Sequence, residues 1–262
     1  MKIASQYVKG FKSLRNKIQR QVPISKTQKK ESLPEEPIEL LILGVLMEYV
    51  TLSEAKSILK RLREEMTDYN ELRVTSLSEF EELLKGKMKD PVAFGRVLTR
   101  TLNGVMDEFD TLELSFLDEL PKPEVKKHFE NIKEGSLHGL AFFLMMRFDI
   151  NIMPLTEKML GFLVSCGALP EEIDVETAKA FIERQLKASE IKNFYWLVRK
   201  ASEMGASKFK SKSKTKAKKV SKKASKQSEK SKASKSKSRG TGVSKRSKAK
   251  KKTSKKSTKS KA

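Results

Sequence analysis

The chain of 262 residues has a formal net charge of +23, and this charge is concentrated at its two ends. Residues 1–30 carry nine basic and no acidic side chains, residues 31–206 carry 22 basic and 32 acidic ones, and residues 207–262 carry 25 basic ones against Glu229. Any affinity for polyanions is therefore expected to belong to the ends before the acidic middle part.

The composition also excludes several kinds of site. Cys166 is the only cysteine, which rules out an internal disulfide and any metal or iron–sulfur site built from cysteines alone. Two histidines are too few for a convincing zinc site, so we expect no metal and no other cofactor. The longest apolar run, residues 40–47, is far shorter than the roughly 20 residues that span a bilayer. We expect a soluble cytoplasmic protein, associated with the nucleoid if its source is bacterial.

The first segment, residues 1–30, is predicted to be a basic amphipathic helix followed by a linker. Apolar residues recur there at spacings of three and four among lysines and arginines: Ile3, Tyr7, Phe11, Leu14 and Ile18. Such a helix either docks its apolar stripe on the rest of the protein or contacts phosphate groups or an anionic membrane. The polar, proline-containing run from residue 23 to 37 is typical of a linker.

The middle segment, residues 31–206, is predicted to be one all-α domain of about ten helices. A nearly continuous apolar helix follows Pro37, and Gly205 ends the last helix. Helix-start signals lie at Ser53, Ser78 with Glu81, Asp90 with Pro91, Asp174 and Ser189, whereas Asp68 to Thr75 is predicted as a connection. No segment alternates with a period of two over a useful length, and no pattern repeats every 20–50 residues.

The most specific pattern runs from Ile132 to Gly167. A polar turn at residues 132–136 precedes an apolar helix from Leu137 to Phe148, and a second helix begins at Thr156, eighteen residues after His138. This order resembles the helix-hairpin-helix and following acid of the endonuclease III-like DNA glycosylases, the HhH-GPD superfamily. The resemblance extends over roughly residues 37–200, including the apolar opening helices and the Tyr-Trp-Leu-Val segment at 195–198. It implies an endonuclease III-like fold and a place in base excision repair.

The residues that carry the family's chemistry differ in this chain. His138 stands where lyase members have a lysine, and histidine cannot form the Schiff base of that reaction. Thr156 stands where the family has its catalytic aspartate; it can cap a helix but has no charge to supply. Glu157 is the candidate replacement acid, with Asp149 a weaker one. The iron–sulfur cysteines that follow the position of Trp196 in cluster-bearing members are missing, so no cluster is expected.

The turn and the last segment contain the candidate DNA contacts. In the family, glycines of the turn let backbone N–H groups approach a phosphate. The corresponding candidates are Lys133, Gly135, Ser136 and His138, although Glu134 should repel a phosphate. In the last segment the candidates are Lys208, Lys210, Lys212, Lys214, Lys216, Lys218, Lys219, Lys222 and Lys223.

The last segment, residues 207–262, consists mainly of lysine, serine, alanine and threonine, with Phe209 as its only aromatic residue. It has too little apolar surface to offset its ordering entropy, so we predict that it is disordered. Its composition resembles the tails of linker histones and bacterial histone-like proteins. We therefore expect a non-catalytic DNA-binding protein with an endonuclease III-like base-excision-repair fold, anchored to the phosphates of DNA by its lysine-rich tail. The alternatives are an active DNA glycosylase or abasic-site lyase, and a module that binds RNA or a protein partner.

Overall fold

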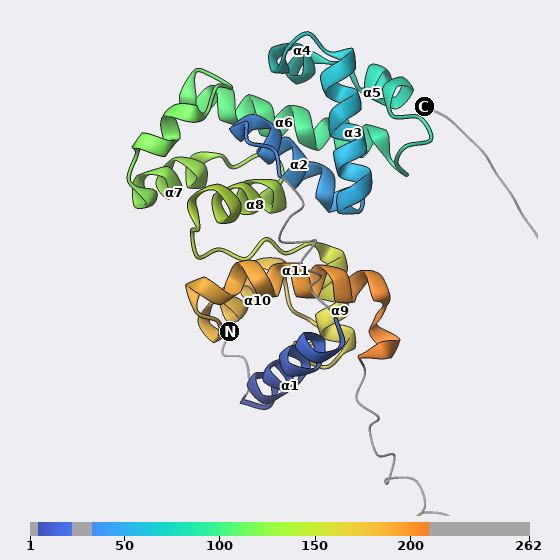
Figure 1. Cartoon of the computed structure of the whole chain (residues 1–262), viewed down its shortest axis with the longest axis vertical. Coiled ribbons are helices and arrows are strands. Elements are labelled where there is room, and N and C mark those ends of the chain that lie inside the picture. Colours follow the sequence, from blue (N-terminus) through green and yellow to red (C-terminus); the bar gives the residue numbers. More distant parts are fainter. Residues whose placement is uncertain (1–4, 23–32, 210–262) are drawn as a thin grey trace, which may run out of the picture. The chain divides into compact units, whose positions relative to one another are not determined.

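The structure, a computed structural model, describes residues 5–22 and 33–209. These residues form eleven α-helices and two short 3-10 helices and contain no strand (Figure 1). The all-α prediction is confirmed for this part of the chain, all of which belongs to one compact unit, Met1–Lys212. None of the helices within the described ranges is long and apolar enough to cross a membrane. Most of the predicted linker and the lysine-rich segment from residue 210 onward lie outside the described residues.

One group of helices is built around α2. Its members are α2 (Pro37–Tyr49), α3 (Leu52–Glu65), α4 (Tyr69–Val74), α5 (Leu77–Leu83), α6 (Pro91–Phe109), α7 (Lys122–Asn131) and α8 (Leu137–Phe148), with the 3-10 helix η1 (Ser115–Glu119) before α7. Helix α2 contacts α3, α6 and α8, and every residue from 37 to 47 is buried. This burial on all sides explains why the sequence of α2 is apolar nearly all round.

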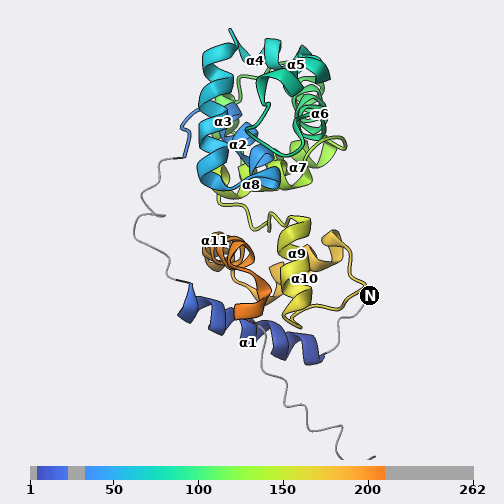
Figure 2. The ribbon, with the colours of Figure 1, turned by 90° about the vertical axis from the view of Figure 1, so that its right-hand side faces the viewer.

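The other group brings the N-terminal helix together with the last helices of the body (Figures 1 and 2). Its members are α1 (Ser5–Gln21), α9 (Glu157–Ser165), α10 (Val175–Gln185) and α11 (Ala188–Met204). The ring of Phe11 in α1 lies 5.6 Å from that of Phe181 and 5.3 Å from that of Phe194. The apolar stripe of α1 is therefore docked on the body, as one of the two sequence interpretations had it.

The described fold extends beyond the predicted end of the domain at residue 206. A 3-10 helix, η2 (Ala206–Lys208), leads to Phe209, whose side chain is 2% exposed. The ring of Phe209 packs edge-on against that of Phe162 in α9, with 5.5 Å between centroids. The only aromatic residue of the lysine-rich segment is thus a core residue of the body.

Several helix starts differ from the prediction by two residues. Helix α3 is capped by Thr51 and α5 by Ser76, because each forms a capping box with the glutamate three residues later. Ser189 lies inside α11 rather than before it. The segment predicted as a connection contains α4, capped by Asp68. The starts at Asp90 and Asp174 are confirmed.

Candidate functional site

The turn between α7 and α8 is fixed against α6 by a glycine and a threonine. Gly135 has a φ of +116°, and a Cβ atom added there would lie 2.5 Å from Oγ1 of Thr101. The Ser136 N–H donates to the same Thr101 oxygen at 2.9 Å, and the Ser136 hydroxyl accepts the Gly139 N–H at 2.7 Å, which caps α8. Ser136, a predicted phosphate contact, is 2% exposed, and its hydroxyl is hydrogen-bonded within the fold.

The charges on the outer side of the turn are exposed. Lys133 and Glu134 both face solvent, and Nε of Arg100 in α6 lies 4.0 Å from the Glu134 carboxylate. Arg100 partly offsets the negative charge that was expected to repel a phosphate. Arg100 was not identified from the sequence. Its one signal was a spacing of four residues from Arg96, which places both arginines on the same face of α6, where both are exposed.

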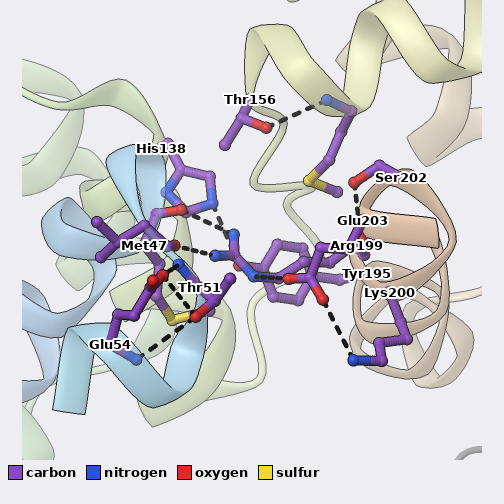
Figure 3. Close-up of polar contacts among 12 residues, drawn as sticks. Met47, Thr51, Glu54, His138, Thr156, Tyr195, Arg199, Lys200, Ser202 and Glu203 are labelled. Carbon is purple, nitrogen blue, oxygen red and sulfur yellow. Dashed lines mark hydrogen bonds and ion pairs between the residues drawn. The ribbon is translucent and has the colours of Figure 1, made fainter. Parts of the chain in front are cut away.

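His138 is enclosed and makes two internal hydrogen bonds (Figure 3). Its Nδ1 lies 3.0 Å from the Gly44 carbonyl oxygen and its Nε2 lies 3.2 Å from the Tyr195 hydroxyl. Because a carbonyl only accepts, Nδ1 carries the proton and Nε2 accepts from Tyr195. Burial, aided by the positive charge of Arg199, lowers the pKa of His138 to about 3. The ring is neutral and 2% exposed, so it lies away from the surface where a phosphate was expected.

Thr156 caps α9, as predicted. Its hydroxyl accepts the Met159 N–H at 3.2 Å (Figure 3), and the residue is 6% exposed. Glu157 lies exposed in the first turn of α9, where a carboxylate is favoured by the helix dipole. Asp149 ends α8 with a φ of +52°, and its carboxylate pairs with Lys192 at 2.5 Å. The Asp149 carboxylate therefore forms an ion pair within the fold, with Lys192 of α11.

A pocket of about 210 Å³ lies between the end of α2, the start of α9 and α11. Its lining includes Thr156 and Glu48, but not Glu157. The Ser136 hydroxyl donates to the Glu48 carboxylate at 2.7 Å, so this acid links the turn to the end of α2. Glu48 as a residue is exposed, yet protein atoms crowd its carboxyl group. This desolvation raises the pKa of Glu48, the Ser136 hydrogen bond lowers it, and the nearby Glu157 raises it again.

Arg199 ties α11 to the end of α2 from inside the protein (Figure 3). It is 7% exposed and donates to two carbonyl oxygens, that of Met47 at 2.8 Å and that of Val50 at 2.7 Å. A positive charge at the C-terminal end of a helix is favoured by the helix dipole. Its Nε lies 3.9 Å from the Glu203 carboxylate.

Sequence reasoning missed both Glu48 and Arg199. The only signals were a charged residue near the end of a buried apolar helix and an arginine one turn after Tyr195 on the buried side of α11.

The remaining candidates lie at the end of the described chain or beyond it. Lys208 is exposed. Eight further lysines fall outside the described residues: Lys210, Lys212, Lys214, Lys216, Lys218, Lys219, Lys222 and Lys223. Within residues 5–22 and 33–209, no three or more His, Cys, Asp or Glu side chains are grouped so that they could hold a metal ion.

Comparison of the chain with models of protein families and with curated proteins produced no match. The resemblance to the HhH-GPD superfamily therefore depends on the residues of this chain alone.

Proposed function

We propose that this protein binds DNA through the phosphate backbone, with residues 207–262 supplying most of the affinity. In this proposal the body has an endonuclease III-like fold and does not catalyse. The observation that carries the proposal is the 25 basic residues against one acid in that segment. Neutralising many phosphates releases counterions, which makes affinity steeply salt-dependent and nearly independent of sequence. Lysines greatly outnumber arginines there, which argues against bidentate recognition of guanine.

The environment of the two family positions supports a body without catalysis. Thr156 satisfies a backbone N–H of α9 but has no charge to stabilise a developing cation at a sugar. His138 is neutral and enclosed, so it offers no amine to a substrate. The turn adds a limited phosphate contact, in which Lys133 is exposed and Arg100 pairs with Glu134.

The test neutralises the segment in the full chain. Replacing the eight lysines between residues 210 and 223 by glutamine should reduce the salt dependence of duplex binding, measured by fluorescence anisotropy between about 50 and 200 mM salt. The matched control replaces serines of the same stretch by alanine, which leaves the charge unchanged. Equal affinity and equal salt slope for the lysine variant and the unmodified chain would contradict the proposal.

A deletion gives a second test, and the structure determines where to cut. Phe209 packs on Phe162, so the chain should end after Phe209 rather than at residue 206. The shortened protein should lose most of its affinity for duplex DNA and most of the salt slope. Competition with single strands and structured RNA distinguishes a DNA-binding protein from an RNA-binding one.

A second candidate function is base excision in which Glu48 supplies the missing carboxylate. The pocket beside Thr156 favours it, because Glu48 lines this pocket and is held there by the Ser136 hydroxyl. The raised pKa of Glu48 suits a general acid or base. Glu157 is exposed and does not line this pocket.

Two glutamine variants test this second candidate. The protein is incubated with duplexes that contain uracil, oxidised pyrimidines, alkylated purines or abasic sites, and base release and strand cleavage are measured. Release that is lost in Glu48→Gln and kept in the matched Glu157→Gln would favour catalysis by Glu48. Absence of release with every substrate, while DNA binding persists, leaves the non-catalytic proposal.

A further inference from the structure

Helix α1 presents a basic surface that the proposed function does not use. Ser5–Gln21 contains five basic residues and no acid. Three of them are exposed, Lys9, Lys12 and Arg20, and the exposed Asn16 lies between the last two at helical spacing. Arg15 belongs to another side of the helix, where its guanidinium pairs with Glu190 of α11 at 2.5 Å.

Contacts on the opposite side of α1 hold this face toward solvent. Phe11 packs against Phe181 and Phe194, and Leu14 and Ile18 are also buried. The backbone of α1 also lies close to the backbone of the loop after α9, because a Cβ atom added at Gly10 would lie 2.7 Å from a backbone oxygen in that loop. The helix is thereby fixed in its rotation about its own axis.

The same burial selects between two partners for the basic face. A helix that binds a membrane inserts its apolar face between the lipids. Phe11, Leu14 and Ile18 of α1 are already buried, with Phe11 packed on α10 and α11, so the face left open to a partner is the charged one. A surface that offers cations without an apolar face suits the phosphate backbone of a nucleic acid.

The loop that supports α1 also lies beside the point where the lysine-rich segment begins. Gly10 approaches Gly167, and Sγ of Cys166 lies 4.0 Å from the Ala206 carbonyl oxygen. Phe209 packs on Phe162, one turn before Cys166. Residues 206–209 and α1 are therefore anchored to one short stretch, residues 162–168 (Figure 2).

We propose that the exposed face of α1, with Lys9, Lys12 and Arg20, is a second contact for the phosphate backbone of duplex DNA. Lys9 and Arg20 are separated by about 16 Å along the helix axis, a length over which duplex DNA presents about ten phosphate charges. Once the lysine-rich segment is bound, the contact by α1 is intramolecular and gains from a high effective concentration. This inference rests on the proposed function, because both contacts bind the same polyanion.

The experiment compares two triple variants of the full chain. One is Lys9→Gln, Lys12→Gln and Arg20→Gln, and the matched control is Lys85→Gln, Lys87→Gln and Lys89→Gln, which removes three exposed lysines from the loop after α5. Binding to a duplex is measured across a salt series, with thermal unfolding to verify the fold of each variant. The α1 variant should lower the salt slope by about 2 to 3 and weaken binding about tenfold or more. The control should leave both close to those of the unmodified chain.

The possible results separate this inference from the proposed function. If the unmodified chain binds duplex DNA and the α1 variant binds with the same slope, the inference fails and the proposed function stands. If the unmodified chain shows no salt-dependent binding, both fail. A parallel measurement with anionic phosphatidylserine vesicles covers the other partner. Loss of vesicle binding with unchanged duplex binding in the α1 variant would assign this face to membranes and overturn the inference.

Discussion

Two regions of this protein hold polar residues in opposite environments. In the interior, His138, Tyr195 and Arg199 join α2, α8 and α11 through contacts that exclude solvent. On the outside, Lys9, Lys12 and Arg20 of α1 are exposed to solvent. His138 and Thr156, the two ends of the eighteen-residue interval that suggested an active site, are both buried and hydrogen-bonded within the fold. Variants of the interior should therefore change the free energy of unfolding without changing the salt slope of the proposed DNA binding, and variants of the outside should do the reverse.

Arg199→Met should give the largest effect on stability. The change removes the Arg199 donors from the buried Met47 carbonyl oxygen and from the partly buried Val50 carbonyl oxygen at the end of α2, and we expect a loss of about 3 kcal/mol in the free energy of unfolding. The neighbouring Lys200→Met is the control, since Lys200 is exposed and its pair with Glu203 should contribute about 0 to 1 kcal/mol. Urea unfolding measures both. If Arg199→Met left the free energy of unfolding unchanged and reduced the salt slope of DNA binding, the expected difference between the two regions would be contradicted.

Gly135→Ala should be somewhat less destabilising. A side chain at a φ of +116° is strained, and the new Cβ atom would collide with Thr101 of α6, so we expect a cost of about 2 to 3 kcal/mol. Gly86→Ala is the matched variant: Gly86 has a φ of +70° but open space around it, and about 1 kcal/mol is expected. The difference between the two variants in thermal or urea unfolding measures the collision with Thr101 together with the additional backbone strain at a φ of +116°. Equal costs would mean that the turn relaxes so that neither effect remains.

His138 should make stability depend on pH. Its folded pKa of about 3 lies below the ordinary value of 6.5, so the unfolded chain binds the proton first as the pH falls. The stability that the neutral His138 ring contributes to the folded state is fully present above pH 6.5, and it is lost progressively as the pH falls toward 3. Between pH 7 and pH 5 the loss should be about 2 kcal/mol.

The glutamine variant separates this effect from the titration of carboxylates. His138→Gln keeps an N–H donor and an acceptor but does not titrate, so its stability should change less than that of the unmodified protein between pH 7 and pH 5. The measured quantity is the difference in the free energy of unfolding between the two proteins, obtained from urea unfolding at each pH. Parallel pH profiles would show that the ring is not held neutral by burial.

The sequence predicted several features whose causes lie within one helix, although it placed the caps of α3 and α5 two residues too late. The bounds of α8 and the caps at Asp90, Thr156 and Asp174 follow from apolar spacing and from side chains that bond the backbone three residues later. The site did not follow in the same way, because its contacts join distant parts of the chain. Ser136 and Glu48 are 88 positions apart, and their hydrogen bond leaves no periodic or local sign in the sequence.

Thr156 gives the smallest expected effect and the most direct test of what this position retains. Thr156→Ala removes the cap of α9 and should cost about 1 kcal/mol in urea unfolding, similar to Thr51→Ala at the start of α3. Thr156→Asp should cost less than Thr156→Ala at neutral pH, because aspartate also caps a helix and its charge favours the helix dipole. Repulsion from Glu48 and Glu157 reduces this advantage, and replacing Glu48 by glutamine in the same chain should restore part of it. If Thr156→Ala costs nothing, the hydroxyl does not hold the helix start, and packing alone would account for the threonine.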